Sequence, residues 1–188
     1  IRLNTQEATR TAAILEQHAL NVFETVQLVA DRVNAELGQM SWQQIERSRE
    51  LHATLKRLEQ QYPQVAAIWL TDAEGRVRNA SRPLPQNPIF VRDRDYFQNL
   101  KDGSRTFSFG SIVEPRVISE LNFNIGFRRG SGRFNGVHIL TVLPDYFSRF
   151  WTSAIIRPQS SALLFRPAGT LLAQVPALDP ARSKLAPA

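Results

Sequence analysis

Hydrophobic positions in the first part of the chain repeat with the period of a helix. Neither proline nor glycine interrupts residues 1–37, and Gly38 supplies a stop signal. At about 1.5 Å per residue, the predicted helix is roughly 55 Å long, which exceeds the width of a small domain. We therefore expect it either to pack along its own sheet or to project as a stalk that pairs with another helix. Its apolar stripe consists of Leu15, Ala19, Val22, Val26, Val29 and Val33.

A second helical pattern follows at residues 41–62. Ser41 has Gln44 three positions later, which is the arrangement of a capping box, and Pro63 ends the pattern. We predict a single helix between them, with apolar positions at Ile45, Leu51, Leu55, Leu58 and Tyr62.

From residue 65 onward the pattern is typical of strands. Strands are predicted at 65–71 and 76–80, joined as a hairpin around Gly75, and at 106–114, 121–127 and 134–143. Residues 81–88 contain three prolines and indicate a loop, and residues 95–100 indicate a short helix. This order predicts an α+β fold: a five-stranded antiparallel sheet with helices on one face and a loop-covered pocket on the other.

Two stretches of the sequence resemble each other, AIWLTDAEGRVRNA at 67–80 and ALLFRPAGTLLAQV at 162–175. Each has an apolar strand, a turn with a glycine (Gly75 or Gly169) and a second strand. The repeat indicates two copies of one sheet module, and a chance similarity between two hairpins is the alternative. We divide the chain into a helical stalk with a second helix at 1–62, a complete module at 63–150 and the start of a second, incomplete module at 151–188.

The amino-acid composition gives little information about the binding partners of the chain. The 188 residues carry a net charge of +6, and 20 of the 23 basic side chains are arginine. A basic surface suits nucleic acid, anionic lipid or anionic ligands, but no nucleic-acid fold motif accompanies it, and a coding bias toward arginine explains the excess equally well. The absence of cysteine excludes disulfides and cysteine-based zinc sites. The chain contains no apolar run long enough to span a membrane and begins at Ile1 inside a helical pattern, so we expect a fragment of a longer protein.

No catalytic, metal or cofactor motif is recognisable. His18, His52 and His138 are too scattered in the sequence to form a ligand set, and His138 is expected to be a structural histidine. The sequence lacks HExxH, GxSxG and Walker motifs, and it predicts neither a cofactor nor an enzyme. Asp93 and Asp95 flank Arg94, and we expect them to be its ion-pair partners rather than an acid–base dyad.

The segment from Arg92 to Phe97 has the chemistry of a small-anion site. A guanidinium such as that of Arg94 binds a carboxylate through two parallel hydrogen bonds. Tyr96 can cover the apolar part of a ligand and donate a hydrogen bond. The alternative is an arginine–aspartate network that pins this loop to the sheet.

These residues also carry a family resemblance. The segments DRDYF at 93–97, FSFGSIVEP at 107–115 and GRFNGVHILTVLPDYFSRFW at 132–151 resemble double Cache sensor domains, also called tandem PAS-like or PDC domains. The resemblance covers about residues 22–175. It implies two PAS-like modules, the second incomplete, in the periplasmic part of a bacterial inner-membrane receptor. It also implies a long helix that leaves a membrane span and forms a homodimer, and a membrane-distal module that holds the ligand.

The resemblance further implies roles for individual residues. Arg94 matches the arginine that grips the ligand carboxylate in amino-acid-binding members, and Tyr96 matches their aromatic wall. Phe97 replaces a tyrosine, Glu114 matches an aspartate that holds the ligand amine, and Thr141 stands where a second aspartate often lies. These departures favour a simple carboxylate over an amino acid, with Arg92 as a further candidate contact.

The function expected from these observations is small-molecule sensing for a two-component histidine kinase. A diguanylate cyclase or a chemoreceptor is the alternative output, and a structural or interaction module without a ligand is the alternative of a different class.

Overall fold

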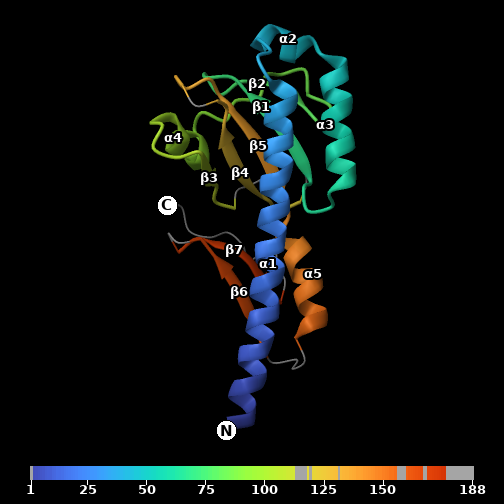
Figure 1. Cartoon of the computed structure of the whole chain (residues 1–188), viewed down its shortest axis with the longest axis vertical. Helices are drawn as coiled ribbons and strands as arrows, with labels where there is room; N and C mark the ends of the chain where they lie inside the picture. Colours follow the sequence, from blue (N-terminus) through green and yellow to red (C-terminus); the bar gives the residue numbers. More distant parts are fainter. Residues whose placement is uncertain are drawn as a thin grey trace.

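The computed structural model describes residues 2–112, 118, 120–130, 132–155, 160–166 and 169–176, with side chains from residue 5 onward. One helix, α1 (Arg2–Leu37), runs along nearly the whole molecule (Figure 1), and this confirms the predicted long helix. No helix in these ranges is both long and apolar enough to cross a lipid bilayer.

The apolar stripe of α1 packs inside the chain's own core. Every member of the stripe, from Leu15 to Val33, is at most 8% exposed and belongs to one cluster with the sheet, α3 and α5. The stripe is therefore not the surface of a projecting, dimer-forming stalk, which corrects one of the two sequence expectations. Only the first turns of α1 extend past the other elements (Figure 1).

The predicted second helix is two helices, α2 (Trp42–Arg47) and α3 (Arg49–Gln61). The capping box is present, since Gln44 N–H donates to Ser41 Oγ at 3.3 Å and Ser41 N–H donates to Gln44 Oε1 at 2.7 Å. Ser48 interrupts the run in an extended conformation, and its hydroxyl accepts from Leu51 N–H at 3.0 Å. A serine hydroxyl satisfies the first amides of a new helix, so the chain can turn here without losing hydrogen bonds.

The five-stranded antiparallel sheet is confirmed. It consists of β1 (Ala67–Thr71), β2 (Val77–Ala80), β3 (Phe107–Phe109), β4 (Phe123–Arg128) and β5 (Val137–Val142), in the order β2-β1-β5-β4-β3. The short helix is also confirmed, as α4 (Asp95–Lys101). The predicted strand 106–114 is shorter than expected, and its residues 113 and 114 lie outside the described residues.

The two faces of the sheet carry different cores. Alternation along β1 sends Ile68 and Leu70 toward α1 and α3, and Ala67 and Trp69 toward α4. The predicted apolar face of β4 follows the same rule, because Phe123, Ile125 and Phe127 all join the cluster beneath α1. The opposite face is left for α4 and the segment that precedes it, and this face holds the candidate site.

One helix was not predicted. In α5 (Pro144–Ala154) Pro144 occupies the first turn, where its missing amide costs nothing. Phe147 and Trp151 are four residues apart and both buried, and α5 packs against both α1 and β7. The predicted boundary at residue 150 falls inside this helix, and the division into domains stays a prediction.

The second hairpin is confirmed as β6 (Ala162–Phe165) and β7 (Leu171–Val175), which form a separate two-stranded antiparallel sheet. It lies beside α1, below β3 and β4 in Figure 1. Leu172, Ala173 and Val175 of β7 are buried in the core shared with α1, whereas Leu163 and Phe165 of β6 are each 53% exposed.

Candidate functional site

A chain of hydrogen-bonded side chains lies on the sheet face that α4 covers, with Trp69 and Thr141 buried and Asn124 half-buried. Trp69 Nε1–H donates to Thr141 Oγ1 at 3.0 Å, and the Thr141 hydroxyl donates to Asn124 Oδ1 at 2.6 Å. Thr141 and Asn124 are direct cross-strand partners on β5 and β4, and Thr141 is 1% exposed. The strands therefore build a polar floor whose members already satisfy one another.

Helix α4 is seated on this face through two glycines. A Cβ at Gly126 would lie 2.9 Å from Tyr96 Cδ2, and one at Gly110 would lie 2.7 Å from Tyr96 Cδ1. Both distances are too short for real atoms, so the Tyr96 ring approaches the backbone where only glycine leaves room. Tyr96 is 3% exposed and lies on the same sheet face as the polar floor.

Arg94 occupies the N-cap position of α4 with extended dihedral angles. Its side chain is half-buried, and no hydrogen bond or ion pair joins the guanidinium to a described residue. The predicted ion pair between Arg94 and Asp95 does not form, because Asp95 Oδ2 instead lies 3.1 Å from Nη1 of Arg166. A charge that is half-buried and not engaged by these residues is available to an anion.

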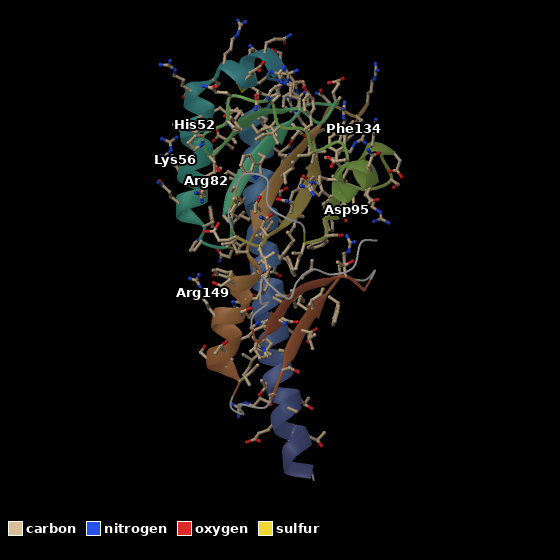
Figure 2. The ribbon with its side chains drawn as sticks, turned by 180° about the vertical axis from the view of Figure 1, so that it is seen from behind. His52, Lys56, Arg82, Asp95, Phe134 and Arg149 are labelled. Carbon is tan, nitrogen blue, oxygen red and sulfur yellow. The ribbon has the colours of Figure 1, made fainter. Side chains whose placement is uncertain are left out.

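The other predicted residues occupy different surroundings. Arg92 is exposed, with its guanidinium 5.3 Å from the centre of the Phe90 ring. Phe97 is 1% exposed and packs edge-on against Phe134 at 5.4 Å between ring centres. Figure 2 shows Phe134 and Asp95 on either side of α4. Glu114 lies outside the described residues.

The structure thus brings Tyr96 and Phe97 of α4 to the sheet face that contains Thr141, and it places Arg94 at the N-cap of the same helix. The roles of these residues, and of Arg92 and Glu114, in ligand binding stay predictions. Sequence reasoning missed Trp69 and Asn124. Strict alternation along β1 and β4 could have found both, because it places them on the face that Thr141 occupies.

The histidines are structural in this arrangement. His52 Nδ1 is 2.7 Å from the Ala80 carbonyl oxygen, and His18 stacks on Phe150 at 4.0 Å between ring centres. His138 is buried on the α1 face of β5, where burial lowers its pKa to about 4. Among the described residues, no group of three or more histidines and carboxylates is placed to bind a metal ion.

Within the described residues, two of the hollows lie away from this sheet face. A groove of about 560 Å³ runs between the first half of α1, α5 and β6. Glu7 and Glu16 line it together with apolar and hydroxyl side chains, so it is a poor site for an anion. A smaller hollow of about 210 Å³ at α2, α3 and β2 contains arginines, of which Arg78 and Arg82 are already paired with Glu46 and Glu59.

Comparison with known proteins identifies solved structures that share this fold. No family model and no curated relative matches the sequence. Among solved structures, the extracellular domain of rpHK1S-Z16, assigned as a histidine kinase, is 23% identical with a TM-score of 0.79. The ligand-binding domain of the Campylobacter jejuni chemoreceptor Tlp3, solved with L-valine, is 12% identical with a TM-score of 0.60. The sensor domain of the V. cholerae histidine kinase DctB is 11% identical with a TM-score of 0.60.

The chain therefore has the fold of the extracellular sensor domains of histidine kinases and chemoreceptors. The predicted resemblance is confirmed at the level of the fold. The three matches cover 94%, 92% and 85% of this chain but only 73%, 72% and 62% of the respective structures.

Proposed function

We propose that this chain is the small-molecule sensing domain of a membrane-anchored bacterial receptor, placed in the periplasm, and that it binds and does not catalyse. The observation that carries the proposal is the half-buried guanidinium of Arg94, which no described residue engages, at the start of a helix seated by Tyr96 on a polar floor. The fold shared with extracellular sensor domains supports it.

The ligand class follows from the charges near Arg94. A carboxylate would be held by the planar guanidinium and covered by the Tyr96 ring. An α-amino group would additionally need an anionic partner, and the described floor offers only the neutral side chains of Trp69, Thr141 and Asn124. We therefore infer a small carboxylate without an amine, and amino acids are the competing class because the Tlp3 structure holds L-valine.

The output of the parent receptor is proposed to be a histidine kinase. The matched structures include sensor domains of both kinases and a chemoreceptor, so a chemoreceptor, or a diguanylate cyclase, is the competing output. The coding sequence downstream of this domain distinguishes them, because a second apolar span followed by a kinase region is expected.

A thermal-shift screen tests ligand binding. The wild-type domain is melted with acetate, pyruvate, succinate, L-valine and L-isoleucine, and at least one carboxylate is expected to raise Tm because a ligand that binds the native state stabilises it. Arg94→Ala should abolish that rise while leaving the melting temperature without ligand nearly unchanged.

Arg149→Ala is the control, because it removes an exposed guanidinium of α5 whose ion pair with Asp145 stays within that helix. It should keep the ligand-induced rise. A rise that survives in Arg94→Ala rejects Arg94 as the anchor, and the absence of any rise across the screen rejects the sensing function for these ligand classes.

A further inference from the structure

We propose that Asp95 and Arg166 form a positioning pair that couples the candidate ligand site to the second module. The biological role of this coupling rests on the proposed function, but the coupling itself can be measured in the protein without ligand. Asp95 belongs to α4, and Arg166 directly follows β6, so the pair joins elements of the two predicted modules. Figure 2 shows Asp95 at the side of α4 that faces the β6–β7 hairpin.

The pair is part of a small network at the end of β3. Arg166 Nη1 donates to Asp95 Oδ2 at 3.1 Å and to the Phe109 carbonyl oxygen at 2.8 Å, and its Nη2 donates to Ser111 Oγ at 3.0 Å. Ser111 in turn donates to the same Asp95 oxygen through its amide at 3.0 Å and its hydroxyl at 2.8 Å. One carboxylate thus holds both the strand end and the arginine.

The geometry of this network is restrictive. The Arg166 side chain is 17% exposed, and its Nε is buried without a partner among the described residues. Its backbone is fixed by the tight turn of the second hairpin, where Arg166 N–H donates to the Thr170 carbonyl at 3.0 Å and Gly169 has a φ of +82°. A charge held in this way loses several hydrogen bonds at once if its partner moves.

Three consecutive residues connect the proposed ligand site to the contact with the second module. Arg94 is the proposed anchor of the ligand, Asp95 holds Arg166, and Tyr96 seats α4 on the sheet. The Asp95 carboxylate also accepts from the Tyr96 amide at 2.8 Å through its other oxygen. A ligand that shifts the start of α4 must therefore shift the Asp95 carboxylate. Arg166 then either moves with the carboxylate or loses its ion pair. Linkage makes the effect reciprocal, so loosening Arg166 must loosen α4.

Hydrogen exchange of the domain without ligand tests the coupling. Arg166→Gln is expected to speed exchange of the α4 amides by about tenfold, the size expected for losing a charge-assisted hydrogen bond. Asp95→Asn is expected to speed exchange across β6 and β7 by a similar factor. Arg166→Lys keeps the charge but not the planar fork, and it should restore the α4 protection only in part.

Arg149→Gln is the matched control, because it removes an arginine from an ion pair with Asp145 that stays within α5. It should leave exchange in α4 unchanged. If Arg166→Gln speeds exchange only in its own hairpin, and Asp95→Asn only around α4, the pair is a local contact and the coupling is wrong.

A second arm adds acetate or L-valine to each variant. In wild type, the bound probe is expected to change exchange in β6 and β7, and this change should disappear in Arg166→Gln but persist in Arg149→Gln. A probe that binds wild type without altering the hairpin overturns the proposal. If neither probe binds wild type, the proposed function fails for these two ligands, and the experiment without ligand still decides the coupling.

Discussion

The hydroxyl of Thr141 joins three strands through their side chains. It accepts from the Trp69 indole of β1 and donates to the side-chain amide oxygen of Asn124 on β4, and Thr141 itself is 1% exposed. Buried polar groups are expensive when one partner is lost, because the remaining donor and acceptor are then desolvated without compensation. Thr141 thus holds the floor of the candidate site together, whichever ligand lies above it.

Replacing Thr141 by valine tests this role. Thr141→Val keeps the shape but leaves both partners without their hydrogen bond, so the free energy of unfolding should fall by about 1–3 kcal/mol. Urea denaturation measures it. Thr9→Val is the control, because its hydroxyl bonds only the Thr5 carbonyl on the exposed surface of α1. Equal effects of the two substitutions would show that the buried hydrogen bonds of the floor contribute no more than one exposed hydroxyl bond.

Candidate site residues could be proposed from the sequence where one short motif carries them, and their roles stay predictions. Arg94 and Tyr96 are two positions apart in the sequence, and their chemistry makes them candidates without a structure. The partner of Asp95 could not be predicted, because Arg166 lies 71 positions away and a nearer arginine stood on each side of the carboxylate. Only the fold determines which guanidinium reaches it.

At the scale of elements, His138 fixes how β5 meets α1. The ring stacks on Phe127 at 5.5 Å between centres, and the backbone of Ala30 lies close to it. Burial, and to a smaller extent the nearby Arg129, lower its pKa to about 4, and the Ala30 backbone opposes this shift. The neutral ring is therefore the form that the α1–sheet interface accepts.

The lowered pKa predicts an acid-sensitive interface. The pKa of His138 is about 4 in the folded protein and the ordinary pKa of histidine is 6.5, so the unfolded chain takes up the proton first as pH falls. The stabilising contribution is complete above pH 6.5 and is lost progressively toward pH 4, by about 3 kcal/mol in total. Urea denaturation at several pH values measures it. In His138→Gln this part of the pH dependence should vanish, and an unchanged slope would contradict the account.

Element prediction succeeded where a periodic pattern was long and failed at its interruptions. The stripe of α1 spans many turns and identified the helix. Ser48 could not be recognised as a break because the apolar spacing continues across it from Ile45 to Leu51. Helix α5 was missed because it begins directly after a strand, although Pro144 and the four-residue spacing of Phe147 and Trp151 are helix signals.

At the scale of the whole molecule, the apolar stripe of α1 is buried in the chain's own core and is not available to a homodimer interface. Leu15 to Val33 are occupied by the chain's own core, so we propose that dimer contacts use an exposed side of α1 outside the stripe. That face carries Ile14 at 45% exposure and Leu28 at 56%, two heptads apart and therefore on one side of the helix.

Sedimentation analysis tests the dimer. The wild-type domain is expected to dimerise reversibly, and the double variant Ile14→Glu, Leu28→Glu should be monomeric because two buried like charges would oppose each other across the interface. Leu84→Glu is the control, since it places a charge at a similarly exposed apolar position outside α1. A wild-type monomer at every accessible concentration removes the proposal for the isolated domain.

The repeated hairpin made the whole-molecule organisation partly predictable. Both hairpins form as expected, and the α+β fold with a five-stranded sheet is confirmed. The contact between the modules could not be predicted, because α5, the β6–β7 sheet and α1 meet through side chains from distant segments. Periodicity reports which face of an element is apolar, but it does not report which neighbour covers that face.

A structure of the domain with its strongest-binding carboxylate tests the central claim most directly. The account predicts that the ligand carboxylate contacts the Arg94 guanidinium beside the Tyr96 ring, on the sheet face that carries Thr141. A ligand found in the groove between α1 and β6, or bound with Arg94 turned away from it, would contradict the account.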